Sequence, residues 1–398
     1  MSPREIEPPD AMRTACTRRA TPGPIHPDPR ASSSMPRLTT IAAALALTLL
    51  AVHVDAQTPT PAPAAPPKPP TIVPPVVPNA APVVTERIKV RGASLEGNLE
   101  GDSPERDVIV YLPPSYAKSP GRRYAVLYAL HGYSISNEKW TTEIRTPQTV
   151  EGAFATGTRE MIVVLANAQT LHNGSMYSNS VTTGNWEDFI AHDLVSYVDA
   201  HYRTLARRES RGIAGHSMGG YGTVRIAMRH PDVFSAFYAM SPCCLSARAA
   251  PSPEMGKRVE AAVAAGQSAS LDFGTRAMLA SAAAWSPNPK APPFYVDLPT
   301  KDGVPQPTVL ARWAANAPLA MVDQYVANLR RYSAIALDVG DRDGLRFDTA
   351  ALHRILDDYG IANTFEQYAG DHVSAVADRM QNHVLPFFAH HLVFDGAK

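Results

Sequence analysis

The chain has no excess of charge of either sign. Lys and Arg together number 37, Asp and Glu together number 37, and the net charge at neutral pH is zero. A basic surplus would indicate a nucleic-acid or anionic-membrane partner, and an acidic surplus would indicate a solvating tail. Composition therefore suggests neither, and we expect no nucleic-acid partner.

Cysteine is scarce, with three among 398 residues. Cys16 lies in a polar leader, whereas Cys243 and Cys244 are adjacent. Neighbouring Cα atoms are about 3.8 Å apart across a trans peptide, below the usual lower limit of about 4.4 Å for a disulfide. The pair is therefore either two free thiols or a strained vicinal disulfide, and it does not staple the fold.

Cofactor and metal signatures are also absent from the sequence. No Cys/His spacing typical of zinc sites occurs. No G-x-G-x-x-G follows an expected strand, which argues against a dinucleotide-dependent enzyme. We expect no cofactor and no metal.

The main apolar run is too short to span a bilayer comfortably. It covers residues 38–52, follows Met35, and is succeeded by Val54-Asp55-Ala56, which has small residues where a signal peptidase reads. We interpret residues 1–34 as an upstream non-structural segment and 35–56 as a signal peptide cleaved after Ala56. The alternatives are an uncleaved anchor or a buried helix. Cleavage predicts a secreted or periplasmic protein without stable membrane insertion.

Proline, by contrast, is abundant and unevenly distributed. The chain has 37 prolines, of which 19 fall in residues 1–82. Proline fixes φ and lacks the backbone donor, so it opposes helices and sheet ladders. We expect residues 57–82 to form an extended linker that takes no part in chemistry, and the catalytic domain to cover residues 83–398.

Beyond Pro82, short β-branched runs alternate with helical patterns, which is typical of a mostly parallel α/β sheet flanked by helices. About eight strands are expected, at 84–92, 106–112, 124–130, 161–166, 211–215, 235–240, 333–339 and 362–368. Helices are expected at 187–202, 218–229, 347–359 and 373–390. Several strands are apolar throughout and should be buried on both faces.

One segment interrupts this alternation after the sixth strand. Residues 245–316 contain two Ala-rich helical patterns, at 254–266 and 272–284, followed by a Pro-rich loop to about residue 309. Long insertions are tolerated thermodynamically, and loops often carry function. The insertion is either a lid over a pocket or a surface excursion.

A G-x-S-x-G pattern, Gly215-His216-Ser217-Met218-Gly219, stands between an apolar strand and a helical segment. In this context the serine occupies a sharp strand-to-helix turn that small neighbours allow. The pattern predicts that Ser217 is a nucleophile, with His216 packing beside it. The alternative is a Gly-rich turn selected for packing alone.

A serine nucleophile needs a histidine base oriented by a carboxylate, and these follow later strands in the order Ser, Asp/Glu, His. His372 comes directly after the last strand, and the loop after the seventh strand offers Asp341 and Asp343. We favour Asp343, because it precedes Gly344 and can reach over the sheet edge. Asp341 lies closer to the strand end.

Stabilising the charge of a tetrahedral intermediate requires two backbone donors. The expected donors are the N–H groups of Met218 and Tyr133, and the latter follows His131-Gly132 after the third strand. His131 is then structural. Nearby aromatic residues stack on a substrate ring or belong to the core: Tyr133, Trp140, Tyr177, Trp186 and Tyr221.

The ordered strings YLPPSY (111–116), YAVLYALHGY (124–133), WEDFIAHDLVSYVDAHYRT (186–204), RGIAGHSMGGYG (211–222), GDRDG and GDH resemble those of the esterase-D-type putative esterase family. That family includes feruloyl and acetylxylan esterases, S-formylglutathione hydrolases, enterochelin esterases and mycolyltransferases. The resemblance implies an α/β-hydrolase fold and ester or thioester hydrolysis. It assigns the nucleophile to Ser217, the acid to Asp343 and the base to His372.

The sequence thus predicts an exported serine hydrolase that cleaves a carboxylic ester of a carbohydrate, a phenolic or another small compound through an acyl-enzyme. Export argues against a cytosolic thioester substrate. The alternatives are an acyltransferase to a sugar with the same triad, and a catalytically silent binding module. The acyl group, the alcohol and the oligomeric state are not specified by the sequence.

Overall fold

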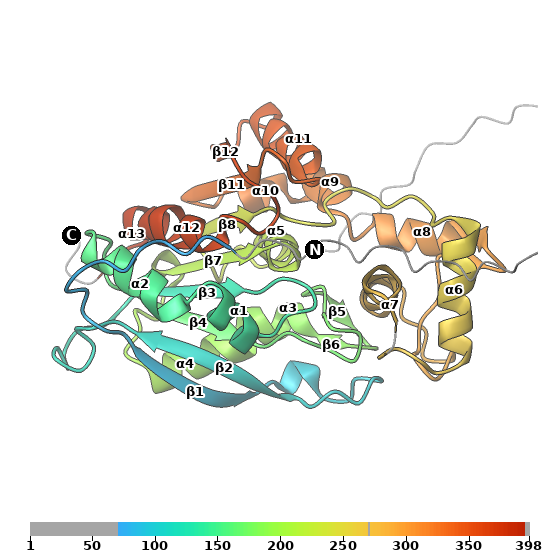
Figure 1. Cartoon of the computed structure of the whole chain (residues 1–398), viewed down its shortest axis with the longest axis horizontal. Helices are drawn as coiled ribbons and strands as arrows, with labels where there is room; N and C mark the ends of the chain where they lie inside the picture. Colours follow the sequence, from blue (N-terminus) through green and yellow to red (C-terminus); the bar gives the residue numbers. More distant parts are fainter. Residues whose placement is uncertain (1–70, 270, 395–398) are drawn as a thin grey trace, which may run out of the picture. The chain divides into compact units, whose positions relative to one another are not determined.

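A computed structural model describes residues 71–269 and 271–394, all within the unit that runs from Pro66 to Lys398 (Figure 1). The predicted upstream segment (1–34) and signal peptide (35–56) lie outside the described residues.

The described residues are organised around an eight-stranded sheet with the order β1-β2-β4-β3-β7-β8-β11-β12. β2 runs antiparallel to both β1 and β4, and the other neighbours are parallel. The strands are β1 (Val84–Arg91), β2 (Glu105–Leu112), β3 (Val126–Leu130), β4 (Ile162–Ala166), β7 (Arg211–His216), β8 (Ala236–Met240), β11 (Ala334–Gly340) and β12 (Thr364–Tyr368). This sheet confirms the predicted fold class and all eight predicted strands.

The central strands are buried on both faces, as their unbroken apolar runs predict. Every residue of β3, β4, β8 and β11 is buried. Because parallel strands end at the same edge of a sheet, the loops after β7, β11 and β12 emerge side by side. These loops carry Ser217, Asp343 and His372.

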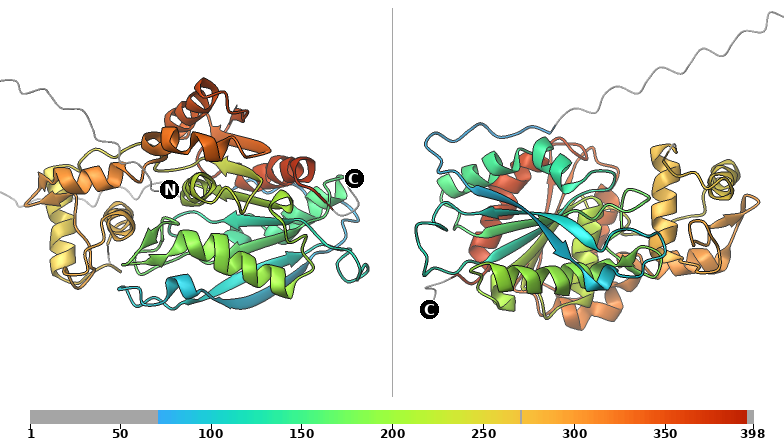
Figure 2. Two further views of the ribbon diagram at one scale, coloured as in Figure 1. Left: turned by 180° about the vertical axis from the view of Figure 1, so that it is seen from behind. Right: turned by 90° about the horizontal axis from the view of Figure 1, so that it is seen from below.

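Helices cover both faces of the sheet (Figures 1 and 2). One face is covered by α1 (Asn137–Glu143), α2 (Thr146–Ala155), α12 (Val376–Arg379) and α13 (Leu385–His391). The other is covered by α3 (Trp186–Asp188), α4 (Leu194–His201), α5 (Met218–Arg229) and α11 (Arg346–Asp358). The four predicted helical stretches are all present, whereas α1 and α2 were not predicted. No helix among the described residues is both long and apolar enough to cross a membrane.

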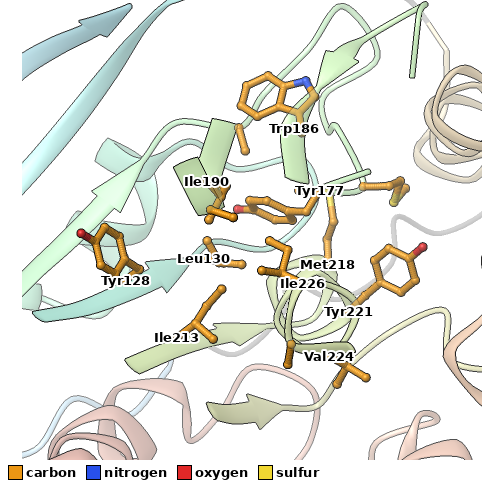
Figure 3. Close-up of a cluster of buried hydrophobic side chains, with 14 of the residues drawn as sticks. Tyr128, Leu130, Tyr177, Trp186, Ile190, Ile213, Met218, Tyr221, Val224 and Ile226 are labelled. Carbon is orange, nitrogen blue, oxygen red and sulfur yellow. The ribbon is translucent and has the colours of Figure 1, made fainter. Parts of the chain in front are cut away.

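Helix α5, which follows Ser217, is packed into the core on almost all sides. All its residues from Met218 to Met228 are buried. Figure 3 shows Met218 and Ile226 of α5 close to Leu130 of β3 and Ile213 of β7. Burying each such side chain contributes about 1.5–3 kcal/mol, so the helix holds the Ser217 turn against a rigid base.

The insertion between β8 and β11 forms a group of helices beside the sheet (Figures 1 and 2). Its helices α6 (Pro253–Ala264) and α7 (Phe273–Trp285) match the two predicted Ala-rich patterns. The segment predicted as a Pro-rich loop ends in a further helix, α8 (Pro307–Ala314), because Pro307 stands at the first helical position, where its missing N–H has no cost. Shorter elements are β5 (Asn179–Ser180), β6 (Gly184–Asn185), β9 (Thr300–Lys301), β10 (Val304–Pro305), α9 (Pro318–Met321) and α10 (Val326–Leu329).

Residues 71–82, the described part of the predicted linker, form a Pro-rich strap along α2 and the loop before α12 (Figure 1). The Ile72 N–H donates to the Ser374 carbonyl oxygen (2.8 Å), and the Gln148 side chain donates to the Pro74 carbonyl oxygen (2.8 Å). The Thr71 hydroxyl accepts from the Ala377 N–H at 3.3 Å. As the prolines predict, the strap has no helix or strand, but tertiary hydrogen bonds fix it in place, which a free spacer would lack.

Candidate active site

Ser217 occupies a sharp turn between β7 and α5. Its backbone angles are φ 58° and ψ −114°, a strained conformation for a residue with a side chain, which costs about 1–3 kcal/mol. Two glycines make the turn fit. A Cβ atom at Gly219 would lie 2.0 Å from the Leu130 carbonyl oxygen, and one at Gly215 would lie 2.3 Å from the Gly219 carbonyl oxygen. No larger residue fits either position without moving backbone.

The structure brings Ser217, His372 and Asp343 together at the sheet edge. The Ser217 Oγ lies 2.9 Å from His372 Nε2, and His372 Nδ1 lies 2.8 Å from Asp343 Oδ2. The Asp343 side chain is 3% exposed, whereas the His372 side chain is 34% exposed. An imidazole thus stands between a hydroxyl and a buried carboxylate, with one edge open to a ligand.

The carboxyl group of Asp343 remains ionised despite its burial. Burial alone would raise its pKa, but the hydrogen bonds from His372 and from the Leu345 N–H, together with the charge of His372, outweigh it. The pKa of Asp343 therefore lies below its ordinary value. An ionised carboxylate accepts only, so it fixes the proton of His372 on Nδ1 and leaves Nε2 facing Ser217.

Asp341, the alternative acid, has a different place. Its Oδ1 accepts from the Gly370 N–H (3.0 Å), and it forms an exposed ion pair with Arg342 (3.4 Å). These contacts tie the loop after β11 to the loop after β12. Asp341 therefore supports the loop of His372, while Asp343 contacts the imidazole.

The loop after β3 lies directly beside Ser217. A Cβ atom added to Gly132 would be 3.5 Å from the Ser217 Cβ, so Tyr133, the next residue, is close to Ser217. His131 anchors this loop, because its Nε2 accepts from the Ala168 N–H (2.8 Å). Burial lowers the pKa of His131 to about 4, so the ring is neutral and structural, as expected. The Met218 N–H stands in the first turn of α5 and has no intrahelical acceptor.

His216 has a role that sequence reasoning missed. Its Nε2 donates to the main-chain oxygen of His372 at 2.7 Å, and burial lowers its pKa to about 3. The neutral ring therefore supports the loop that carries His372. The only signal in the sequence was its place next to Ser217.

A cavity of about 470 Å³ opens beside Ser217 and His372. It is lined by Thr71, Gly132, Tyr133, Ser134, Ile135, Lys139, Trp140, Glu143, Ile144, His216, Ser217, Phe273, His372, Val373 and Val376. Of the five aromatic candidates, Tyr133 and Trp140 line the cavity, whereas Tyr177, Trp186 and Tyr221 are buried in the core. The contributors that the sequence analysis missed include Thr71 from the strap and Phe273 from the insertion.

One group of side chains among the described residues has ligand atoms close enough to hold a metal ion. The ligand atoms of Asp188, His192 and His230 lie within 4.8 Å of one another. Ser217 precedes the first residue of α5 and His230 follows the last, so the two are about 20 Å apart along the helix. The group is therefore separate from the Ser217 site.

Similar proteins include several esterases. The chain is 33% identical over 133 residues to Esterase Rv1288 of Mycobacterium tuberculosis (32% of this chain, 27% of the relative). It is 29% identical over 136 residues to an endo-1,4-beta-xylanase/feruloyl esterase of Xylanibacter ruminicola (33% of this chain, 19% of the relative). The matches thus span about a quarter or less of these relatives' length.

Solved structures share the fold. A ferulic acid esterase has a TM-score of 0.56 and 23% identity, covering 79% of this chain and all of that one. An S-formylglutathione hydrolase from Staphylococcus aureus has a TM-score of 0.52 and 17% identity, covering 77% of this chain and 99% of that one. These similarities support an α/β-hydrolase fold. The family model described as a putative esterase matches residues 103–382, well over half of the chain, and the chain therefore belongs to the putative esterase family.

Proposed function

We propose that this protein is an exported serine esterase that cleaves a carboxylic ester of a small phenolic or carbohydrate compound. The observation that carries the proposal is the line of hydrogen bonds from Ser217 through His372 to Asp343, at 2.9 and 2.8 Å. Ser217, at one end of this line, borders a cavity of about 470 Å³, a volume within the range of small-molecule sites.

In the first half of the proposed reaction, His372 Nε2 takes the proton of the Ser217 hydroxyl as the oxygen attacks the ester carbonyl. The ionised Asp343 stabilises the imidazolium that forms. The N–H groups of Tyr133 and Met218 stabilise the oxyanion of the tetrahedral intermediate. His372 then protonates the leaving alcohol, and an acyl group remains on Ser217.

In the second half, a water molecule replaces the alcohol. His372 takes a proton from the water, the hydroxide attacks the acyl carbonyl, and the same two N–H groups stabilise the second oxyanion. The carboxylic acid leaves as Ser217 regains its proton from His372. The 34% exposure of the His372 side chain supports access of water to Nε2.

The cavity favours an aromatic or other planar apolar group on the ester. Its aromatic contributors are Tyr133, Trp140 and Phe273, with Ile135 and Ile144 beside them. Aromatic rings stack or meet edge to face, which suits a flat acyl group better than a branched one. The similarity to a relative named as a feruloyl esterase supports the same substrate class.

Export is proposed from the sequence, because the apolar run at 38–52 and the small residues before Gln57 have the pattern of a cleaved signal. The test is N-terminal sequencing of the protein recovered from outside the cytoplasm. A mature chain beginning at Gln57 supports export, and a chain beginning further upstream in the cell pellet contradicts it.

The esterase proposal is tested with p-nitrophenyl acetate, p-nitrophenyl butyrate and methyl ferulate on the wild type and on Ser217→Ala. We expect the variant to lose at least about a thousandfold in kcat/KM while its circular dichroism is unchanged, because the nucleophile is lost from an intact site. The control variant is Ser281→Ala, which changes a serine on α7 and should keep the wild-type activity. Turnover by Ser217→Ala near the wild-type rate would overturn the assignment.

A further inference from the structure

We propose that Cys243 and Cys244 form a peroxide-sensitive dithiol at the back of the nucleophile turn, in which Cys244 is the reactive thiolate and Cys243 resolves it into a reversible vicinal disulfide. Both cysteines are free and half-buried. They lie between β8 and the insertion, two residues after the strand ends. The hydrolytic mechanism uses neither of them.

Arg248 is the group that favours a thiolate at Cys244. Its Nη2 lies 2.8 Å from the Cys244 Sγ, while its Nη1 donates to the Ser281 hydroxyl of α7 at 2.9 Å. The guanidinium also lies over the Trp285 ring, 5.3 Å from the centroid. Helix α7 thus holds a permanent positive charge against one particular sulfur, and such surroundings produce reactive cysteines.

The two sulfurs differ in protonation because they are hydrogen-bonded to each other. The Cys243 thiol and the Arg248 charge together lower the pKa of Cys244, against the opposing effects of burial and Asp348. The same contact and burial raise the pKa of Cys243. Cys244 is therefore the sulfur that loses its proton first, and Cys243 is the neighbouring sulfur that keeps its proton.

The different protonation of the two sulfurs matches the two steps of disulfide formation. The Cys244 thiolate attacks one peroxide oxygen, the O–O bond breaks, and with one proton the products are Cys244 sulfenic acid and water. The Cys243 sulfur then attacks the sulfenyl sulfur, and hydroxide leaves with the Cys243 proton as a second water. The two thiols lose two electrons, and one peroxide is reduced to two water molecules.

The disulfide would be strained and hence easily reduced. The trans peptide bond holds adjacent Cα atoms about 3.8 Å apart, below the usual lower limit of about 4.4 Å for a disulfide. Closing the disulfide must therefore change the backbone dihedral angles of residues 243–244. Strained disulfides have higher reduction potentials and serve as labile rather than structural links. A dithiol such as dithiothreitol should therefore restore the pair.

Rearrangement of this backbone would reach the nucleophile. The Cys243 N–H donates to the main-chain oxygen of Ser217 at 3.1 Å, and the same oxygen accepts from the Tyr221 N–H at 2.9 Å. Oxidation would thus disturb the strained turn of Ser217 from behind. This consequence rests on the proposed esterase function, whereas the thiol chemistry itself does not.

The thiol chemistry is tested by mass spectrometry on the full chain. Tryptic cleavage places both cysteines in the peptide from His230 to Arg248. We expect iodoacetamide to label Cys244 at least about tenfold faster than Cys243 at neutral pH, because alkylation needs the thiolate. We expect a small excess of hydrogen peroxide to remove two hydrogen atoms from this peptide, and dithiothreitol to restore them. Equal labelling rates, or a peptide unchanged by peroxide, would overturn the proposal.

Three variants separate the roles. Arg248→Gln should slow the labelling of Cys244 about tenfold, whereas Arg258→Gln on α6 should leave it unchanged. Cys243→Ser should stop oxidation at the sulfenic acid, which dimedone traps. Unchanged labelling in Arg248→Gln, or no dimedone adduct on Cys244 in peroxide-treated Cys243→Ser, would contradict the assignment.

The link to the nucleophile is tested on the same samples with p-nitrophenyl acetate. We expect peroxide to lower kcat about tenfold or more, and dithiothreitol to recover it, in the wild type but not in Cys243→Ser. Formation of the disulfide with no change in kcat would overturn the link. If the chain hydrolyses no ester at all, the proposed function fails, and the mass measurements still decide whether the dithiol exists.

Discussion

The imidazole of His216 donates a hydrogen bond to the main-chain oxygen of His372, with 2.7 Å between the two atoms. The ring centroids of the two histidines are 4.7 Å apart. His216 precedes Ser217 in the chain, and the His372 ring faces Ser217 in space. The turn of Ser217 is thus joined directly to the loop of His372.

His216→Phe should lower kcat for p-nitrophenyl acetate about tenfold with little change in KM. An aromatic ring is retained, but the His372 carbonyl oxygen loses its donor, and a lost buried hydrogen bond costs about 1–3 kcal/mol. The exposed His201→Phe on α4 is the control and should behave as the wild type. An unchanged kcat in His216→Phe would show that the His372 loop needs no such support.

Asp343→Asn should lower kcat about 10⁴-fold with a native circular dichroism spectrum. The amide no longer fixes the proton of His372 on Nδ1, so Nε2 is not available as a base. Asp341→Asn should lose less than about tenfold, since Asp341 binds the Gly370 N–H rather than the imidazole. Reversal of this order in steady-state kinetics would assign the acid to Asp341.

Gly219→Ala should destabilise the fold by about 3 kcal/mol or prevent its recovery in soluble form, because the new Cβ would lie 2.0 Å from the Leu130 carbonyl oxygen. Gly121→Ala is the matched control, since a Cβ there meets nothing within 4 Å. Urea denaturation of both variants gives the difference. Equal midpoints would mean that β3 and α5 can separate without loss.

Glu100→Gln should stabilise the protein at pH 8 but not at pH 4. Burial and the nearby Asp102 raise the pKa of Glu100 to about 9, so the folded state keeps a proton that the unfolded chain releases near pH 4.5. Between about pH 4.5 and pH 9 the folded state binds more protons than the unfolded state, so the free energy of unfolding falls as the pH rises. Glutamine removes that cost. Urea denaturation at both pH values checks the prediction, with the exposed Glu209→Gln as control, and a gain equal at both pH values would contradict it.

Phe273→Ala should lower kcat/KM for methyl ferulate about five- to tenfold while acetyl ester hydrolysis is unchanged. Among the described cavity-lining residues, Phe273 is the sole contributor from the insertion, and its ring meets Tyr133 edge to face at 5.3 Å. Loss of one aromatic contact corresponds to about 1 kcal/mol. An equal loss of kcat/KM for both esters would mean that the insertion does not select the substrate. The insertion would then be a surface excursion rather than a lid.

Much of this architecture can be predicted from the sequence because its signals are local. Strands such as β3 and β4 are apolar at every position, and only a doubly covered sheet accommodates several of them. Since parallel strands share a carboxyl edge, the positions of Ser217, Asp343 and His372 in the chain were enough to predict that they lie close together.

The missed features depend on contacts between distant segments. Helix α1 reads as the polar string NEKWTTE and buries only Asn137, Trp140 and Thr141. Helix α2 begins after Arg145, whose backbone is in the left-handed region, and no sequence pattern predicts this conformation. His216 finds its partner 156 residues away, so its function cannot be read from its neighbours.

The strap at residues 71–82 determines where a fusion partner can be attached to this protein. Thr71 lines the cavity, and Ile72 is bonded to the loop of His372, so the wall of the binding site begins well before the first strand. A partner fused directly at Val83 would replace that wall with foreign sequence. A partner attached upstream of Thr71 would leave the wall intact, and the two fusions should differ in substrate preference even though Ser217, Asp343 and His372 are the same.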